Sequence, residues 1–401
     1  MDDISRYAVG LDVGTENVRA VVASISQSGK ISVVGYNEGK NTGMRKGVVV
    51  NLSGPSEAID KMLGEVERMS GYQINSAFVS TNGAQIISAK VKGMIAVGTV
   101  DHEITEQDLM RVQEVAEVGQ IPQNREALIA VPLDYVLDGQ AGIKDPVGMK
   151  GARLEMNACV VTSLVPNNAN LKKSTENAEV RAEKLIPSAV AAGKAVLNER
   201  QLEQGVAVID MGAATTSVAI YEEGNLQYVG VVPEGSNNIT NDLAIMLKVN
   251  TEIAEEIKCR FVTGSFDGGK IVLKTGREEM HFDREQVNSV VKDRLNEIFE
   301  KVRKELKHAG YDRRLPEGVV LTGGGAKMRD IDVFVRDALE ASVKIGIPNA
   351  LDGVSESVQK PEYAAAVGLM LMAIEDGGRA PVKKEKNGKS GGLLKRFFSK
   401  F

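Results

Sequence analysis

The 401-residue sequence has no tryptophan, two cysteines, three histidines and no apolar run of the roughly 18 residues that a membrane span requires. Cys159 and Cys259 lie far apart and belong to no CxxC pair, which argues against a disulfide framework and a zinc site and fits a reducing cytoplasm. No histidines lie at metal-ligand spacing, so a metal-dependent hydrolase is not indicated. The sequence begins Met-Asp-Asp, which is acidic where a signal peptide would be basic. We therefore expect a cytosolic globular protein of two or three domains or subdomains.

Positive charge is concentrated at the C-terminal end. Residues 379–401 contain eight Lys or Arg and one acid, Glu385, so this segment carries a charge of +7. Since the whole chain carries −5, the preceding residues carry −12. An acidic body with a basic end indicates contact with an anionic surface.

The last residues are apolar as well as basic. Three of the nine phenylalanines fall in the last five positions, where a soluble chain normally ends in polar residues. On a helix, five apolar side chains would lie within an arc of roughly 140°, opposite the polar ones. Residues 377–392 contain no apolar cluster, so we expect them to form a disordered basic linker. The pattern predicts an amphipathic membrane-binding helix at 393–401, whose contacts are Leu393, Leu394, Lys395, Arg396, Phe397, Phe398, Lys400 and Phe401.

Two stretches about 200 residues apart, 7–36 and 205–232, share one design. Each opens with an apolar run that predicts a buried strand, continues through Asp-x-Gly and a small polar turn, and adds two further strands. A glycine marks the second turn in both, and each third strand closes on Val-Gly. Two antiparallel meanders of this kind indicate internal duplication. The predicted strands are Ala8–Leu11 and Val206–Ile209, Val18–Ala23 and Ser217–Tyr221, and two strands that close at 34–35 and 229–230.

The first turn of each meander has the composition of a phosphate-binding loop. A glycine after a buried strand lets backbone N–H groups approach a phosphate, and the threonines and Asn17 add side-chain donors. Asp12 and Asp210 are placed to hold a hydrated Mg²⁺. A third element, Gly323-Gly324-Gly325, follows the apolar run Val319–Leu321 and suits close packing against a base and ribose.

These loops, in this order, resemble those of the actin/Hsp70/sugar-kinase ATPase superfamily through Asp376. The resemblance implies an α/β, actin-like (ribonuclease H-like) duplicated fold, with two lobes around a nucleotide cleft. It also implies connecting helices at 183–196 and 361–373, and ATP with Mg²⁺ as ligands, the ion being held through water by Asp12 and Asp210. The implied nucleotide contacts are Asp12, Gly14, Thr15, Glu16, Asn17, Asp210, Gly212, Ala213, Thr215, Thr216, Gly235, Glu255, Lys258, Gly323, Gly324 and Gly325.

One motif is misleading. Residues 264–271 have the G-x4-G-K spacing of a P-loop, but no Ser or Thr follows the lysine and no buried strand precedes Gly264. We expect the segment Asp267–Lys270 to form a hairpin turn between strands at 260–262 and 271–273.

An insertion at 85–163 distinguishes this chain from other members of the superfamily. A helix is predicted after Thr105, which has Asp108 at capping-box-like spacing, with an apolar stripe of Leu109, Val112 and Ala116. Strand-like segments follow, so the insertion is expected to be a compact α+β subdomain. Its position and the amphipathic C-terminal segment together resemble the FtsA family of bacterial actin-like cell division proteins.

This resemblance implies a peripheral protein at the cytoplasmic face of the cell membrane, at the division septum. It implies self-association into filaments, tethering of FtsZ through its C-terminal peptide, and recruitment of later division proteins by the insertion, with no nucleic-acid partner. The FtsZ peptide would contact Arg294 and Glu297, on a helix that begins near Asp283 and ends at Gly310. The implied subdomains are 1–84 with 164–197 (1A), 85–163 (1C), 198–236 with 319–376 (2A) and 237–318 (2B).

Two alternatives stay open from the sequence: a pilus-assembly actin-like adaptor and a sugar-kinase-like enzyme. No residue identifies itself as a catalytic base. Ala213 and Ala214 stand where many relatives of the superfamily have glycine, which puts fast hydrolysis in doubt. ATP is therefore expected to act mainly as a structural ligand, with at most slow turnover.

Overall fold

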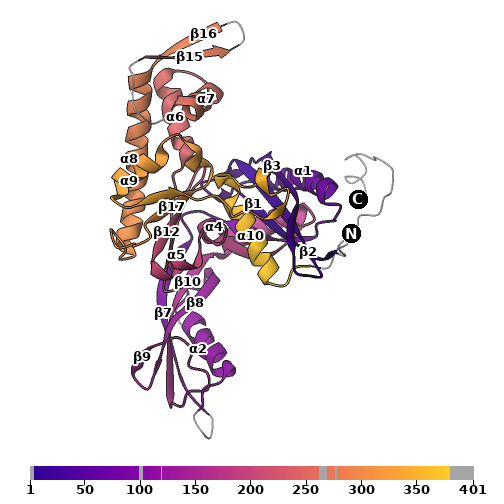
Figure 1. Cartoon of the computed structure of the whole chain (residues 1–401), viewed down its shortest axis with the longest axis vertical. Coiled ribbons are helices and arrows are strands. Elements are labelled where there is room, and N and C mark those ends of the chain that lie inside the picture. Colours follow the sequence, from indigo (N-terminus) through magenta and orange to yellow (C-terminus); the bar gives the residue numbers. More distant parts are fainter. Residues whose placement is uncertain (1–3, 99–102, 119, 262–268, 276–277, 380–401) are drawn as a thin grey trace.

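The computed structural model describes residues 4–98, 103–118, 120–261, 269–275 and 278–379 (Figure 1). Two mixed sheets form the body, and both predicted meanders are present. The first sheet has the order β11-β6-β1-β2-β3-β19 and the second the order β14-β13-β12-β17-β18. The first contains β1 (Ile4–Val13), β2 (Asn17–Ser26), β3 (Ile31–Lys40), β6 (Ser76–Thr81), β11 (Arg181–Pro187) and β19 (Asp352–Gly353). The second contains β12 (Val206–Met211), β13 (Thr216–Glu222), β14 (Asn225–Val232), β17 (Val319–Thr322) and β18 (Val343–Ile345).

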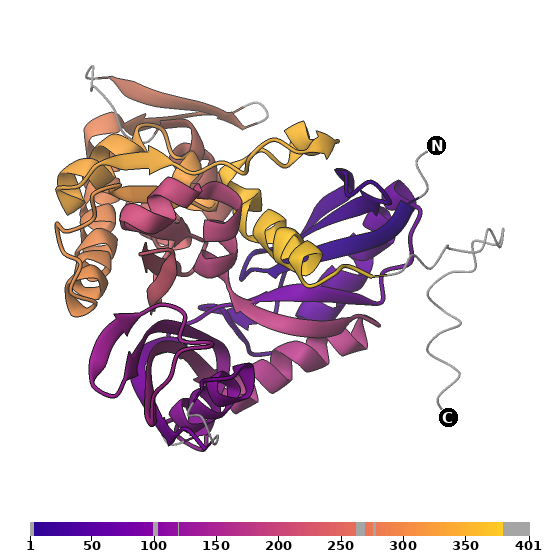
Figure 2. The same ribbon diagram turned by 60° about the horizontal axis from the view of Figure 1, so that its bottom comes forward.

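Two helices lie between the sheets and join the two lobes built on them. The helices α4 (Ser188–Val196) and α10 (Ala364–Glu375) share one hydrophobic core with residues of both sheets (Figure 2). A Cβ at Gly368 of α10 would lie 1.6 Å from the carbonyl oxygen of Ala191 in α4. Any side chain at position 368 would therefore separate the helices.

The outer faces of the sheets are covered by separate sets of helices. Helices α1 (Ser53–Ser70) and α3 (Val165–Asn177) pack on the first sheet, and a short hairpin of β4 (Met44–Arg45) and β5 (Val48–Val49) lies near them. The second sheet shares its other core with α6 (Ser236–Leu247), α7 (Thr251–Phe261), α8 (Arg284–His308) and α9 (Ile331–Leu339), while the short α5 (Glu199–Gln204) contacts β13.

The first predicted connecting helix begins later than expected. Residues 183–187 complete strand β11, which pairs in parallel with β6 from Arg181 to Pro187, and the helix starts only at Ser188. The apolar Leu185 and Ile186 fit a buried strand as well as a helix, and the sequence alone did not separate the two. At the second connecting segment, a turn at Pro361–Tyr363 precedes α10.

The insertion forms a four-stranded sheet of order β7-β10-β8-β9 with one helix. Its elements are β7 (Ile87–Ala96), α2 (Glu106–Val118), β8 (Arg125–Leu137), β9 (Gln140–Ile143) and β10 (Arg153–Leu164). The predicted cap is present, since the Thr105 amide donates to Asp108 Oδ2 at 3.1 Å and the Asp108 amide to Thr105 Oγ1 at 3.4 Å. Figure 1 shows the insertion at one end of the molecule and the β15–β16 hairpin at the other.

The hairpin expected at Asp267–Lys270 is wrong. Arg260 belongs to helix α7, and β15 (Lys270–Thr275) pairs instead with β16 (Glu278–Asp283). The helical pattern of the residues after Ala254 continues into Arg260, so α7 includes a segment that the sequence analysis assigned to a strand at 260–262. Residues 262–268 lie outside the described part of the chain.

Helix α8 matches the prediction closely. The Asp283 carboxylate accepts from the amides of Glu285 and Gln286 at 2.8 and 3.3 Å, which caps its first turn. The buried face contains Val287, Val291, Leu295, Ile298, Phe299, Val302 and Leu306. No helix among the described residues is both long and apolar enough to cross a membrane.

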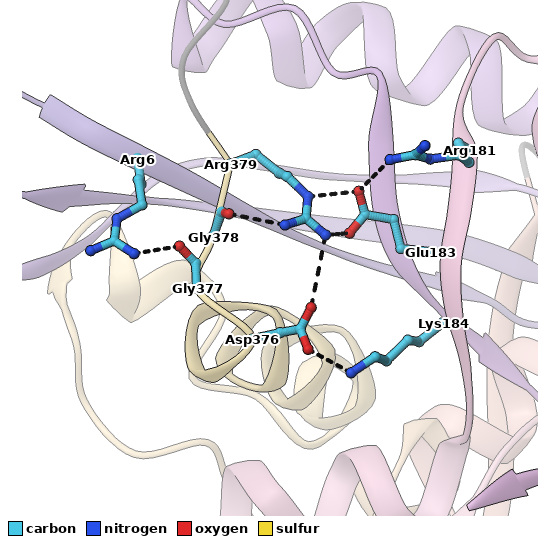
Figure 3. A network of polar contacts seen from close by, with 8 residues as sticks. All are labelled: Arg6, Arg181, Glu183, Lys184, Asp376, Gly377, Gly378 and Arg379. Atoms are coloured by element: carbon cyan, nitrogen blue, oxygen red, sulfur yellow. Dashed lines mark hydrogen bonds and ion pairs between the residues drawn. The ribbon is translucent and has the colours of Figure 1, made fainter.

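The start of the predicted linker is held against the first sheet (Figure 3). Arg379 pairs with Tyr7 of β1 through two backbone hydrogen bonds of 2.8 and 2.7 Å, and its guanidinium contacts both carboxylate oxygens of Glu183. Arg6 donates to the Gly377 carbonyl at 2.7 Å, and Asp376 accepts from Lys184 at 2.6 Å. Residues 377–379 are thus docked by ionic and backbone contacts. The prediction of a disordered linker is wrong for these residues, because it considered only apolar contacts. The predicted membrane helix and residues 380–392 lie outside the described residues.

Arg379 is expected to make this docking pH-dependent. Its hydrogen bonds lower the pKa of Glu183 from 4.5 to about 2. A lowered acid pKa stabilises the docked state above pH 4.5, and this stabilisation is lost as the pH falls from 4.5 toward 2. Because Arg379 is 42% exposed, screening reduces the contribution to about 1–2 kcal/mol.

We therefore expect Glu183→Gln to reduce amide-exchange protection at Gly377–Arg379 by about 5- to 30-fold at pH 7. The difference from the parent should shrink at pH 3. Lys184→Gln removes the exposed pair with Asp376 and the contact with the Phe78 ring, but leaves Glu183 and Arg379 in place, and should change protection less than threefold. Equal protection in Glu183→Gln and parent at pH 7 would show that Glu183 does not hold this segment.

Candidate nucleotide-binding site

A cavity of about 400 Å³ lies between the two lobes. Fourteen of the sixteen predicted nucleotide contacts line it, together with other residues of both sheets. The two exceptions support the wall from behind. Thr216 is fully buried and donates to the Glu234 carbonyl at 2.9 Å, and a Cβ at Gly235 would lie 2.5 Å from the Gly212 carbonyl oxygen.

The two phosphate-loop candidates have the same backbone geometry. The Gly14 amide donates to the Asn17 carbonyl at 3.0 Å, and the Gly212 amide donates to the Thr215 carbonyl at 2.8 Å. A Cβ would lie 2.8 Å from the acceptor oxygen in the first turn and 3.1 Å in the second. Both glycines are therefore required by the turn itself, and their amides are used within it. Phosphate would be bound by the other amides and side chains of these turns.

Asp12 and Asp210 end equivalent strands and face the cavity. Burial raises the pKa of both carboxyls, and the negative charge of Asp12 adds to the shift that brings the pKa of Asp210 to about 6. Ser80 donates to Asp12 Oδ1 at 2.7 Å, and Ser188 lines the cavity together with Asp210. A divalent cation would relieve the repulsion between two such carboxylates, so the pair fits Mg²⁺.

Within the described residues, no cluster of three or more His, Cys, Asp or Glu is arranged to hold a metal. The two aspartates would therefore hold a Mg²⁺ that keeps several water ligands. The ion would shield phosphate charge, while the protein supplies the two carboxylates and the Ser80 hydroxyl that binds Asp12.

Helices α6 and α7 form the wall of the cavity on the second lobe. The amides of Ser236 and Asn237 donate to Gly212 and Ala213 carbonyls at 2.9 and 2.8 Å, which joins the start of α6 to the second phosphate loop. The Lys258 ammonium, on a 4% exposed residue, contacts Glu255 Oε2 at 2.6 Å and the Thr240 hydroxyl at 3.0 Å. Lysine and carboxylate thus stand together in the wall of the cavity.

The three consecutive glycines have different roles. A Cβ at Gly323, where φ is +84°, would lie 2.4 Å from Asp210 Oδ1, and one at Gly325 would lie 2.5 Å from the Met211 side chain. A Cβ at Gly324 would have no protein atom within 4 Å, although Gly324 lines the cavity. Gly324 therefore faces the open cavity, whereas its neighbours pack against β12.

Several cavity residues were missed by the sequence analysis. Arg19 of β2 lies beside the phosphate loops, bound to Glu38 at 3.0 Å and 5.8 Å from the ring centre of Tyr363. Arg19 follows the predicted contact Asn17 by two residues and so lies on the same face of the strand. This spacing could have identified it from the sequence. Cys259 was also missed, although it follows the predicted Glu255 by four residues on α7. Lys40, Ser80, Asn82, Ser188, Lys327 and Glu362 lie elsewhere in the chain and carried no comparable signal.

The predicted partner residues lie away from the cavity, on α8. Arg294 Nε donates to Asp242 Oδ2 of α6 at 2.5 Å, and its Nη1 contacts Glu297 at 2.6 Å. Hydrogen bonding to Asp242 raises the pKa of Arg294. Ile245, also on α6, is 76% exposed. Arg294 is thus already engaged by two acids, and the exposed Ile245 follows one of them, Asp242, by three residues on α6.

The two related sheets, the inserted subdomain and the interlobe cavity define an actin-like protein with a nucleotide-binding fold. Among solved structures, the chain is similar to the PilM–PilN type IV pilus biogenesis complex (TM-score 0.67, 17% identity, 92% of this chain and 98% of that one). It is also similar to MreB5 of Spiroplasma citri bound to ADP (TM-score 0.55, 14% identity, 92% and 97%) and to the MamK double helical filament (TM-score 0.52, 14% identity, 92% and 99%). These likenesses support the fold.

Sequence comparison identifies the family. The model of the cell division protein FtsA matches residues 207–368, and that of the SHS2 domain inserted in FtsA matches residues 83–162. The chain is 34% identical to the cell division protein FtsA of Pseudomonas aeruginosa, over 92% of this chain and 90% of that protein. It is 31% identical to FtsA of Borreliella burgdorferi over 98% of both. The chain belongs to the FtsA family of cell division proteins.

The open space at Gly324 generates a prediction for nucleotide binding. Gly324→Val should fold normally because its Cβ meets no protein atom, but its side chain fills the nucleoside space. We expect ATP affinity, measured by isothermal titration, to fall about ten- to a hundredfold. Gly98→Val, which also enters open space but lies in the insertion, is the matched control.

The two cysteines offer an independent measurement of the same site. Cys259 is exposed and lines the cavity, whereas Cys159 is buried. ATP should therefore protect Cys259 from a thiol reagent in the parent but not in Gly324→Val. Equal ATP affinity in both proteins would contradict the assignment of Gly323–Gly325 to the nucleoside.

Proposed function

We propose that this protein is an ATP-binding, actin-like division protein that forms filaments and tethers FtsZ to the cytoplasmic membrane. The observation that carries the proposal is the cavity, in which both duplicated turns and the triple glycine of an FtsA-family chain meet. The proposed ligands are ATP and Mg²⁺, with Asp12 and Asp210 holding the ion through water. At the septum, the protein would help to assemble the Z ring and recruit later division proteins through residues 85–163.

The proposed role of ATP is structural. A nucleotide between the lobes would bind the phosphate turns of both sheets at once and hold the lobes in one relative position. Such a fixed shape favours repeated contacts between copies, which is the basis of a filament. We propose at most slow hydrolysis, because the Ala213 and Ala214 side chains restrict the backbone of the second turn.

The proposed docking site for the FtsZ C-terminal peptide is the surface of Arg294 and Glu297 on α8. The Arg294 side chain is 22% exposed and lies between Asp242 and Glu297, so an acidic peptide group could share its guanidinium without a large rearrangement. Ile245 on the neighbouring helix offers an apolar contact beside this charge. The combination suits a short peptide that carries both acidic and apolar side chains.

Arg294→Ala should weaken binding of the FtsZ C-terminal peptide by about thirtyfold, because a charge-assisted contact of about 2 kcal/mol is lost. Fluorescence anisotropy measures the affinity. The exposed Lys292 lies on the same helix, and Lys292→Ala is the matched control. Since the Asp242 pair is partly exposed, the melting temperature should change little. Unchanged affinity would remove Arg294 from the site, and no binding by the parent would remove the partner.

The proposed membrane attachment rests on the sequence of residues 393–401. A peptide this short is expected to become helical only at a lipid interface, with its leucines and phenylalanines in the acyl region and its basic groups near anionic headgroups. Each basic group contributes about 1 kcal/mol on an anionic leaflet. Stable attachment therefore requires filaments that present many such segments together.

Deleting Leu393–Phe401, or changing Phe397 to Glu, should move the protein from the pellet to the supernatant in sedimentation with anionic vesicles. ATP and FtsZ-peptide binding should persist, because the cavity and α8 lie elsewhere in the chain. Ser399→Ala changes the polar side of the predicted helix and should leave binding intact. If the truncated protein sediments with the vesicles as well as the parent does, the membrane-anchor proposal fails.

A further inference from the structure

The insertion is connected to one lobe by the chain and to the other lobe by contacts. It leaves the first lobe after β6 and returns to the same lobe at α3. However, Cys159 and Val161 of β10 belong to the same hydrophobic core as Val229 and Val231 of β14, which is part of the second lobe. The insertion therefore packs on a lobe to which neither of its chain connections leads.

A serine of the insertion is hydrogen-bonded to the backbone of the second lobe. The Ser88 hydroxyl, on β7, donates to the Val229 carbonyl at 2.9 Å, and the Val229 amide donates to Ser88 Oγ at 2.9 Å. Among the described strands, β14 is the last of its sheet, and Val229 is fully buried. Removing the hydroxyl would leave two buried backbone groups without these partners, which is costly. Ser88 thus satisfies the edge of the second sheet.

A second contact between the lobes lies six residues earlier, at Asn82. The Gly83 amide donates to Asn82 Oδ1 at 2.8 Å, and because an amide N–H only donates, this atom is the oxygen. The Ser217 hydroxyl, on β13 of the second lobe, donates to the same oxygen at 2.9 Å. Asn82 Nδ2 donates to Ser188 Oγ, at the start of α4, at 2.9 Å. Asn82 therefore also connects the first lobe to the second.

The residues between these two contacts are fixed to the insertion. Gln85 Nε2 donates to the Asn82 carbonyl at 2.6 Å, and the Gln85 carbonyl accepts from the guanidinium of Arg125 on β8. Arg125 Nε also donates to Thr162 Oγ1 of β10 at 2.8 Å. Residues 82–88, which we call the interlobe strap, thus lead out of the first lobe, are held by the insertion and reach the second lobe at both ends.

The two ends of the interlobe strap differ in their relation to the nucleotide cavity. Asn82 lines the cavity, whereas Ser88 does not. A substitution at Asn82 can therefore act on a ligand directly, but one at Ser88 acts only through the relative position of the lobes. The ion pair of Lys144 with Glu223 also joins the insertion to the second lobe, but both side chains are exposed and the pair contributes little.

We propose that Ser88 is a positioning residue for nucleotide binding, because it fastens the interlobe strap to the second lobe where one ligand can reach both phosphate turns. This inference rests on the proposed nucleotide site, and Ser88 acts on that site without touching the nucleotide. Bound ATP and the Ser88–Val229 pair both oppose separation of the lobes, so they are coupled. The factor by which ATP strengthens the pair therefore equals the factor by which the pair strengthens ATP binding.

The test uses the full chain with ATP and Mg²⁺. In the parent, ATP should raise the exchange protection of the Val229 amide about fivefold, because this amide is released only when Ser88 separates from it. Ser88→Ala should lower ATP affinity, measured by isothermal titration, by about three- to tenfold. Ser88→Thr keeps the hydroxyl, so its ATP affinity should stay within about twofold of the parent's.

Ser56→Ala is the matched control. The Ser56 hydroxyl contacts the carbonyl oxygens of Leu52 and Ser174 at 2.7 and 3.0 Å, and all three residues belong to the first lobe. This substitution removes a buried hydroxyl with two backbone partners, as Ser88→Ala does, but breaks no contact between the lobes. It should lower the melting temperature and leave ATP affinity within about twofold of the parent's.

Other outcomes overturn the inference. A merely structural Ser88 would lower the melting temperature of Ser88→Ala without changing its ATP affinity. Equal losses of ATP affinity in Ser88→Ala and Ser56→Ala would show general destabilisation. If Ser88→Ala does not fold, the parent carries the test, and Val229 protection that ATP leaves unchanged contradicts this inference alone. A parent that binds no ATP contradicts the proposed function and this inference with it.

Discussion

The packing of α10 between α4 and β1 is the constraint on which the two-lobed arrangement depends. A Cβ at Gly10 of β1 would lie 2.0 Å from the Ala366 carbonyl oxygen, and a Cβ at Gly368 would lie 1.6 Å from that of Ala191. Glycine at both positions lets backbones touch on two sides of one helix, which places α10 in a single position. The cores of both lobes meet around it. At one end, α10 follows the cavity residues Pro361 and Glu362, and at the other it leads to the docked segment 377–379.

The cavity combines this rigid scaffold with groups that are costly to bury. Burial disfavours the charged forms of Asp12 and Asp210, and the charge of Asp12 adds to this effect at Asp210. Ser80 donates a hydrogen bond to Asp12. Without a bound cation this arrangement destabilises the protein, because two neighbouring carboxylates are buried away from water. A cation with phosphate groups would offset that cost, so the stability of the lobe arrangement and ligand binding are physically linked.

Helix α6 connects the cavity with the proposed partner surface. Its first amides bind the second phosphate loop, and Asp242, further along the same helix, binds Arg294 of α8. Glu234, two residues before the start of α6, pairs with Lys301 of α8. The phosphate loop and α8 are therefore joined by polar contacts at two places along one short path. This contiguity makes α6 the element through which a change at either site would reach the other.

The sequence by itself determined the local features of this protein. Alternating or continuous apolar runs and turn glycines placed both meanders, and the capping residues placed α2 and α8. These features depend on neighbours within a few residues, and so they can be predicted from the sequence. The same reasoning began α4 five residues early, at 183, because a short apolar run fits a strand and a helix equally well. It also assigned residues 377–379 to a disordered linker. Their docking could not be predicted locally, because the partner of Arg379 is Glu183, 196 residues away.

Only the tertiary structure decided which distant residues meet. Loop motifs in the sequence predicted the cavity residues of the turns, but Asn82, Ser188 and Ser217 are ordinary polar residues without such a motif. Asn82 follows β6 and hydrogen-bonds with Ser188 of α4 and Ser217 of β13. Their contact arises because β6, α4 and β13 converge at the cavity, and no spacing in the sequence encodes that convergence. The different roles of Gly323, Gly324 and Gly325 likewise follow from what faces each Cβ position. Hydrogen-bond direction and free space are properties of the folded chain, because both depend on atoms brought together from different elements.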